Sequence, residues 1–229
     1  MKTLKNLNAM LNDGSKIVIV AVLALAGLIT SFSGQNRLFD YFAQFLPLLL
    51  FGLVAIYAQF KGYSLLSFTI LLMIFYPSSI SNFTDAVLQL IGGRFTFTFQ
   101  IFIHFWIGIF LLAMILSILL SGMTLKPKLR NVDLFFLSVG FIHIFIFNNM
   151  IASINSLLLI IIALLVGSRK LAALLFVIKY LMVPLNYIDN LLRYDTLSLA
   201  LHVRSITGVV VLIVLLAYFA KIYPDSAIE

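Results

Sequence analysis

Long apolar stretches recur along this chain, and they constrain its fold more than any other feature of the sequence. Ile17–Phe32, Phe95–Ser121 and Ile206–Tyr223 are each close to the ~20 residues that one membrane-spanning helix needs. Such stretches favour helices over a β-barrel, whose strands alternate apolar and polar side chains. Because 63% of the residues are apolar and only 10% are charged, a water-soluble globule is excluded. The chain is predicted to be an all-α, polytopic membrane protein.

We expect a single integral membrane domain over residues 1–229, with about six or seven spans. The spans are placed at about 17–32, 41–60, 63–80, 95–121, 134–150, 153–167 and 206–223. The apolar stretch Leu134–Gly167 is too long for one span, so we divide it at its central asparagines, because unpaired amides in hydrocarbon are costly. These are Asn148, Asn149 and Asn155. Whether this stretch holds one span or two stays open.

The basic residues indicate the orientation, because Lys and Arg concentrate in cytoplasmic loops. With the N-terminus inside, twelve of the fifteen basic residues fall inside, and only Arg37, Arg94 and Lys221 fall outside. A single span over 134–167 would move Arg169 and Lys170 outside and weaken this bias. The net charge of +7 therefore reports topology and not nucleic-acid binding. We expect a multi-pass protein of the plasma membrane, in contact with the lipid bilayer, with a cytoplasmic N-terminus.

The segment Leu171–Ser205 lies between two expected spans. The span before it ends on the cytoplasmic side, and the span after it begins on the same side. Its first half, Leu171–Leu185, is apolar yet contains Lys179 and Pro184. Its second half is amphipathic, with apolar residues at helical spacing: Tyr187, Leu191, Tyr194, Leu197 and Leu201. We expect a cytoplasmic helix here, lying either on lipid headgroups or in a groove of a soluble partner.

No group of side chains indicates catalysis. The chain has no cysteine, and its three histidines, His104, His143 and His202, stand apart along the sequence. His104 and His143 have no His, Asp or Glu three or four residues away, as a metal pair on a helix would require. No phosphate-binding glycine loop, serine elbow or zinc motif is present. We therefore expect no catalytic residue, no metal site and no cofactor, and the chain is not predicted to be an enzyme.

The segment around residues 183–205 resembles the coupling region of a known family. Its residues are Val183-Pro184-Leu185, then Leu192-Arg193-Tyr194-Asp195-Thr196-Leu197-Ser198-Leu199-Ala200-Leu201, then Val203-Arg204-Ser205. This order is similar to that of the T component, the transmembrane subunit of energy-coupling factor ABC transporters. The opening Leu11-Asn12-Asp13-Gly14-Ser15-Lys16 also looks like the opening of that family, with Gly14 near the usual proline position. The resemblance covers about a quarter of the chain.

The resemblance implies a scaffold that joins cytoplasmic ABC ATPases to a substrate-binding membrane subunit, for import of a vitamin or a metal ion. ATP would be hydrolysed on the partners. Arg204, with Arg193, Asp195 and Ser205, would contact an ATPase groove, and Arg169 would be a second contact. The chain departs from the family in two ways. Ser205 stands where glycine is usual, and the first arginine motif is represented only by Gly167-Ser168-Arg169-Lys170.

A second hypothesis explains why the first arginine motif of the family is not clearly recognisable in this chain. The chain would then be a small membrane protein that works without ATPases, either a substrate-binding membrane subunit or an accessory protein. The patterned segment before Ile206 would in that case only lie on the lipid surface.

Overall fold

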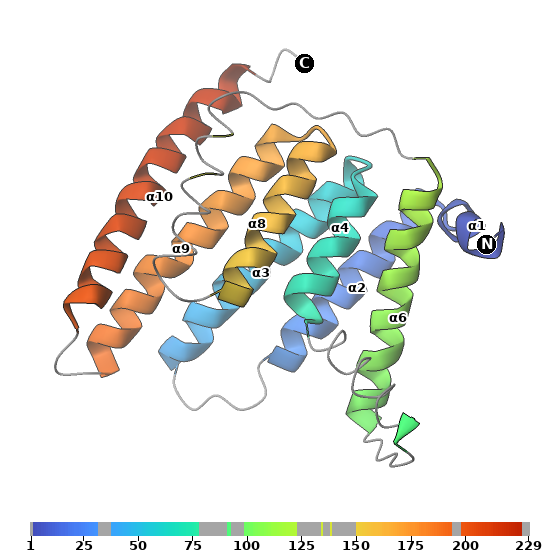
Figure 1. The fold of residues 1–229 in the computed structure, drawn as a ribbon, viewed down its shortest axis with the longest axis horizontal. Helices are drawn as coiled ribbons and strands as arrows, with labels where there is room; N and C mark the ends of the chain where they lie inside the picture. Colours follow the sequence, from blue (N-terminus) through green and yellow to red (C-terminus); the bar gives the residue numbers. More distant parts are fainter. Residues whose placement is uncertain are drawn as a thin grey trace. The chain divides into compact units, whose positions relative to one another are not determined.

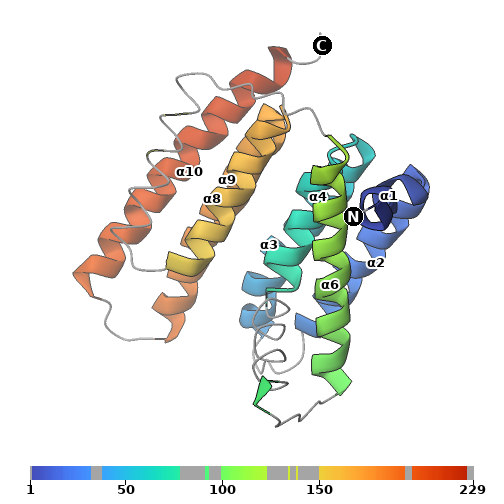
Figure 2. The same cartoon turned by 45° about the vertical axis from the view of Figure 1, so that its right-hand side comes forward.

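The computed structural model describes residues 2–31, 38–77, 91–92, 99–122, 134, 138, 150–193 and 198–225. The elements in this part of the chain are all helical, which confirms the all-α part of the predicted fold class. The helices gather into two compact units, and the prediction of a single domain stays untested. Unit 1 comprises residues 1–30 and 52–124, and unit 2 comprises residues 31–51 and 125–229. Figures 1 and 2 show the helices of each unit.

Unit 1 contains a short N-terminal helix, α1 (Lys2–Met10), and two long apolar helices, α2 (Asp13–Ser31) and α6 (Phe99–Leu120). The helix α4 (Ser64–Ile70) continues into one turn of π-helix, η1 (Leu71–Phe75). α3 (Leu38–Phe60) begins in unit 2, and its residues from Gly52 onward belong to unit 1. α6 packs against α1, α4 and η1.

Unit 2 contains α8 (Met150–Leu165), α9 (Arg169–Arg193) and α10 (Leu199–Asp225). α9 packs against both α8 and α10, so that the three helices lie side by side (Figures 1 and 2). α8 and α9 are joined by a short turn at Gly167, which has a φ of 87°. The Ser168 amide reaches back to the Ala163 carbonyl oxygen at 2.9 Å, which is the bond that closes a glycine-terminated helix end. Antiparallel packing of α8 and α9 follows from this tight turn.

Local signals in the sequence explain where two helices of unit 1 begin and end. Asn12 caps α2, because its Oδ1 accepts the Ser15 N–H at 2.6 Å. Gly62, with a φ of 78°, ends α3, and the following Tyr63 amide bonds back to the Ala58 carbonyl oxygen at 2.8 Å. These two signals place the start of α2 and the α3–α4 turn.

Small residues let the helices of unit 1 pack closely. Gly27 of α2 lies directly against Phe75, because a Cβ added at Gly27 would stand 2.8 Å from Phe75 Cδ1. Ala55 and Ala58 of α3 are fully buried, and the Ser67 hydroxyl of α4 donates a hydrogen bond of 2.8 Å to the Ala55 carbonyl oxygen. Close backbone approach and polar contacts between helices are the interactions that hold helices together in a membrane.

The outer faces of several helices are apolar, as a lipid-exposed surface requires. Four exposed side chains of α2, at spacings of four, three and four residues, form one stripe along the helix: Val18, Val22, Leu25 and Ile29. α10 carries a similar stripe: Val203, Ile206, Val210 and Ile213. Exposed apolar areas of this extent on a protein in water would promote aggregation. The pattern of exposure agrees with a membrane protein.

Three helices in the described part of the chain are long and apolar enough to cross a membrane. The stretches are Asp13–Thr30 of α2, Ile103–Leu120 of α6 and Arg169–Leu192 of α9. The first two coincide with the expected spans 17–32 and 95–121. Shorter apolar helices, Phe45–Phe60, Ser64–Phe75 and Leu199–Val214, fall at or beside the expected spans 41–60, 63–80 and 206–223. The structure thus supports a membrane location and an all-helical fold.

Two boundaries differ from the sequence expectation. α8 begins at Met150 and includes Asn155, so Asn155 is not part of a turn between two spans. The expected span 134–150 lies outside the described residues except for positions 134, 138 and 150, and Asn148 and Asn149 also lie outside them. The division of residues 134–167 into two spans stays a prediction.

The larger difference concerns residues 171–205. The sequence pattern predicts that an apolar segment gives way to an amphipathic one near Leu185. In the structure, α9 continues through Pro184 and ends at Arg193. A proline inside a helix removes one backbone hydrogen bond, and packing against neighbouring helices compensates for this loss in membrane proteins. Leu171, Leu175 and Ile178 are almost completely buried in unit 2, where α9 packs between α8 and α10. α9 is therefore one long helix, long and apolar enough to span the bilayer.

Candidate partner-binding site

The end of the α9–α10 hairpin brings together both halves of the segment that the sequence singles out. We call residues 187–193 and 198–206 the tip. Here the Tyr187 hydroxyl lies 2.6 Å from Nδ1 of His202, and the two rings meet edge to face with centroids 5.6 Å apart. The hydroxyl donates to Nδ1 when the imidazole carries its proton on Nε2. A hydrogen bond and a ring contact thus join α9 to α10 at the tip.

Ser198 fixes where α10 begins. Its carbonyl oxygen accepts hydrogen bonds from the Leu201 and His202 amides at 3.0 and 3.2 Å, and its hydroxyl oxygen lies 3.3 Å from the Leu201 nitrogen. Serine is a favoured residue before a helix, because it satisfies amides that have no partner within the helix. The cap therefore sets the position of His202 opposite Tyr187.

Close packing continues behind the tip. A Cβ added at Gly208 of α10 would overlap the Val183 side chain of α9, so the two backbones approach closely at this point. Ser205, three residues before Gly208, is only 3% exposed. Small residues at a helix interface permit this kind of approach. The hairpin is consequently a packed pair of helices up to its end.

The outer surface of the tip is rich in exposed apolar side chains. Leu199 is 80% exposed and Leu192 is 68% exposed. Four more exposed aliphatic residues surround them: Ile188, Leu191, Val203 and Ile206. An apolar helical surface with a neighbouring arginine is typical of a helix that docks in a groove on another protein. The same surface is also suited to the apolar boundary of a bilayer.

The structure brings together some of the predicted site residues. Arg204 is half-buried on the first turns of α10, and Ser205 beside it is buried. Arg193 is the last residue of α9, at the same end of the hairpin. Asp195 lies outside the described residues. Arg204, Ser205 and Arg193 thus lie at the same end of the hairpin, and their contact with a partner stays a prediction.

Arg169, the proposed second contact, is not at the tip. It is the first residue of α9, whereas Arg193 is the last, so a helix of 25 residues separates them. At 1.5 Å per residue this separation is about 36 Å along the helix axis. One partner surface at the tip cannot also reach Arg169.

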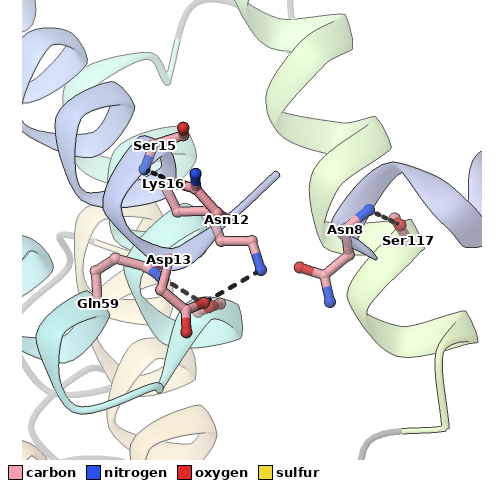
Figure 3. A network of polar contacts seen from close by, with 8 residues as sticks. Asn8, Asn12, Asp13, Ser15, Lys16, Gln59 and Ser117 are labelled. Carbon is pink, nitrogen blue, oxygen red and sulfur yellow. Dashed lines mark hydrogen bonds and ion pairs between the residues drawn. The ribbon is translucent and has the colours of Figure 1, made fainter. Parts of the chain in front are cut away.

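A second group of polar residues lies at one end of unit 1 (Figure 3). The Asn8 amide of α1 donates a hydrogen bond of 2.9 Å to the Ser117 hydroxyl oxygen of α6. Nearby, Lys16 is only 7% exposed, and its Nζ lies 3.6 Å from Oδ1 of the exposed Asp13. Gln59 Nε2 donates to the Ser64 hydroxyl oxygen at 3.0 Å across the α3–α4 turn. Of these contacts, the bond from Asn8 to Ser117 joins α1 to α6, and the other two are local to the start of α2 and to the α3–α4 turn.

Sequence reasoning did not find this polar group or the contact between Tyr187 and His202. Lys16 and Asp13 stand in the opening motif, but their neighbours Asn8, Gln59 and Ser117 are far apart in the sequence and carry no pattern. Tyr187 belongs to the predicted apolar stripe, and His202 stands apart from the other histidines in the sequence. The signal for their pairing is their separation of 15 positions, which suits residues on two consecutive helices that pack side by side.

The histidines do not gather into a metal centre in the described part of the chain, where no group of three or more His, Cys, Asp or Glu side chains could hold an ion. His104 meets Tyr76 edge to face, with ring centroids 5.9 Å apart. His143 lies outside the described residues.

Comparison of the chain with protein-family models, with curated proteins and with solved structures finds no match.

Proposed function

We propose that this chain is a multi-pass subunit of an ATP-driven uptake transporter in the plasma membrane, with about six or seven spans and a cytoplasmic N-terminus. In this proposal the tip of the α9–α10 hairpin contacts a cytoplasmic ABC ATPase, as in the T component that the sequence resembles. Another surface of the chain would hold a substrate-binding membrane subunit. The cargo would be a vitamin or a metal ion.

The observation that carries the proposal is that the tip is held in place and yet apolar on its outside. Tyr187 and His202 fix the two helices against each other, while Leu192 and Leu199 project from the surface. A flexible loop would absorb the movement of a partner. A packed hairpin instead transmits such a movement along α9 to α8, against which α9 packs. Arg204 would add charge-assisted hydrogen bonds to the contact.

The distribution of basic residues supports the orientation. In unit 1, α1, the start of α2, the α3–α4 turn and the end of α6 lie at one end (Figures 1 and 3). Lys2, Lys5, Lys16 and Lys61 all belong to these segments. Because basic residues concentrate on the cytoplasmic side of membrane proteins, this end of unit 1 is assigned to the cytoplasm.

For the tip to meet a cytoplasmic ATPase, α9 must run from the outer side to the inner side, with Arg169 and Lys170 outside. This requires one crossing over residues 134–167 in place of the two that the basic residues favour. This arrangement replaces the expectation that the whole of 171–205 lies inside. The length of α9 and its packing against α8 along the buried residues Leu171, Leu175 and Ile178 support a spanning α9, which this arrangement needs.

The separation of Arg169 from Arg204 favours a second candidate function. A T component uses two arginine motifs on the cytoplasmic side, and here the two arginines lie at opposite ends of α9. A small membrane protein that works without ATPases, as a substrate-binding subunit or an accessory protein, needs neither motif. The tip would then rest on the membrane surface, with Arg204 near anionic headgroups.

Co-purification in mild detergent distinguishes the two functions. The wild-type chain, Arg204→Glu and Arg169→Glu are purified from the native membrane, and the accompanying proteins are identified by mass spectrometry. We expect an ABC ATPase with the wild type and with Arg169→Glu, and its loss with Arg204→Glu. Removing an arginine that pairs with an opposite charge in a protein groove costs about 2–5 kcal/mol of binding free energy. One near lipid headgroups contributes only about 1 kcal/mol.

Arg169→Glu is the matched control, because it makes the same charge reversal on the same hairpin at the opposite end. If no ATPase accompanies the wild type, or if Arg204→Glu retains it in full, the coupling proposal fails and the second candidate replaces it. Equal amounts of the three chains in the membrane show that insertion is unaffected.

A further inference from the structure

Lys179 is a buried amine in the middle of α9. Its Nζ is shielded from solvent and has no hydrogen-bond partner among the described residues. The closest described aromatic contact is the Tyr180 ring, whose centroid lies 5.9 Å from Nζ. A cationic group inside a membrane is costly, at about 2.5–3.5 kcal/mol on insertion scales, and such residues are usually matched by an opposite charge. Lys179 thus has the position of a binding residue, and the described residues offer no partner for its amine.

The depth of Lys179 limits what that ligand can be. It stands ten residues after Arg169 and thirteen before Leu192, the ends of the stretch that can span the bilayer. At 1.5 Å per residue these separations are about 15 Å and 20 Å. The hydrocarbon core is ~30 Å thick, so Lys179 is near its centre. Lysine side chains reach headgroups only from near the helix ends, so a lipid phosphate is out of range.

The chain itself has no carboxylate at this depth on α9. The closest acidic residue along the helix is Asp189, ten residues away, about 15 Å along the axis. In the sequence, the other acidic residues all fall outside the expected spans: Asp13, Asp40, Asp85, Asp133, Asp195, Asp225 and Glu229. The sequence therefore places no acidic residue of this chain at the depth of Lys179, and we expect a carboxylate that meets it to come from another molecule.

Lys179 is placed where its side chain can be reached. As a whole it is half-buried, whereas its neighbours Ile178 and Tyr180 are each 1% exposed. It lies one helical turn before Val183, the residue that meets Gly208 of α10. Part of the Lys179 side chain is thus exposed on the hairpin, and a different rotamer of this flexible side chain would bring the amine to that part.

We propose that Lys179 receives the carboxylate of an aspartate or glutamate at the middle of a membrane-spanning helix of a partner protein. The ion pair would form in the hydrocarbon core, where opposite charges attract more strongly than in water. This contact does not depend on the ATPase contact at the tip. It would hold a membrane partner beside α9 whether or not an ATPase binds the chain.

The test uses a synthetic leucine-rich spanning helix of about 23 residues that carries one aspartate at its centre. Matched helices carry asparagine or leucine at the same position. Binding to the full chain in zwitterionic bilayers is followed by energy transfer from a donor on Ser198→Cys, since the chain has no cysteine of its own. We expect the aspartate helix to bind about tenfold more tightly than the leucine helix, and more tightly than the asparagine helix.

Three variants decide whether Lys179 is responsible. Lys179→Met, which removes the charge and inserts more easily, should abolish the preference for aspartate, and Lys179→Arg should retain it. Lys170→Met, at the end of the same helix, is the control and should leave the preference unchanged. Equal binding of the three helices, or a preference that survives Lys179→Met, overturns the proposal. Loss of the preference when anionic lipid is added also overturns it, because the amine would then be serving lipid headgroups.

Discussion

The hydroxyl of Tyr76, directly after the π-helical turn, donates a hydrogen bond of 2.8 Å to the carbonyl oxygen of Leu23 in the middle of α2. Tyr76 is 2% exposed, so this bond lies in the interior of unit 1. It joins the end of η1 to a residue that lies 53 positions earlier in the sequence. Together with the contact of Phe75 and Gly27, it fixes where this short buried helix stands against α2.

Removing this hydroxyl tests the contact. Tyr76→Phe should lower the free energy of unfolding by about 1 kcal/mol, because one buried hydrogen bond is lost while the ring remains. The measurement is denaturation in mild detergent, followed by circular dichroism. Tyr57→Phe makes the same change on an exposed residue of α3 and should leave stability unchanged. Equal effects of the two substitutions would show that the bond to Leu23 does not contribute.

Gly27 should be intolerant of even one added methyl group. Gly27→Ala places a Cβ within 3 Å of two carbon atoms of Phe75, so the helices must separate, and we expect a loss of about 1–3 kcal/mol. Gly14→Ala on the same helix meets only Asn12 Oδ1 at 3.6 Å, and it should be neutral or stabilising by up to about 1 kcal/mol. Thermal unfolding of the two variants in parallel is the measurement. A stable Gly27→Ala variant would contradict the close packing of α2 and η1.

The cap of α2 should contribute measurably. Asn12→Ala removes the oxygen that accepts the Ser15 N–H, and loss of a cap costs about 1 kcal/mol. Hydrogen exchange at the first turn of α2 should become faster in this variant. Asn6→Ala, on the exposed side of α1, is the control. Unchanged exchange in Asn12→Ala would mean that the first turn is held by other contacts.

At the tip, Tyr187→Phe should loosen the hairpin without unfolding it. Spin labels at Leu191→Cys and Val203→Cys, both exposed, report the distance between the ends of α9 and α10. The distribution of that distance should broaden when the hydroxyl is removed, because about 1 kcal/mol of hydrogen bonding is lost. Tyr57→Phe in the same labelled background should leave the distribution unchanged. A narrow distribution in Tyr187→Phe would show that ring packing alone holds the tip.

Cysteine labelling tests the orientation of α9. In intact cells a membrane-impermeant maleimide should label Lys170→Cys but not Met10→Cys or Ser198→Cys, which become reactive only after permeabilisation. Protection of both Lys170→Cys and Ser198→Cys would place residues 171–205 on the inner side, as the sequence pattern predicts. Labelling of Ser198→Cys in intact cells would put the tip outside and rule out contact with a cytoplasmic ATPase.

The apolar stretches by themselves determined that this chain is helical and suited to a membrane. A run of about 20 apolar residues can satisfy its backbone within a bilayer only as a helix, so α2 and α6 follow from composition and length alone. Local residues also settled several helix ends. Asn12, Gly62 and Gly167 act through their own backbone geometry and the hydrogen bonds of their immediate neighbours, and such effects need no tertiary contact.

Only the tertiary structure decided the course of α9 and the make-up of the tip. Lys179, Pro184 and the polar residues after them lower the helical and membrane signal of the sequence, and packing against α8 and α10 overrides that signal in one continuous helix. The same packing brings Tyr187 to His202 and separates Arg169 from Arg204. A linear pattern records which residues share a helix face. It does not record which neighbouring helix that face meets, and that neighbour decides whether an arginine stands at the tip or at the far end of the hairpin.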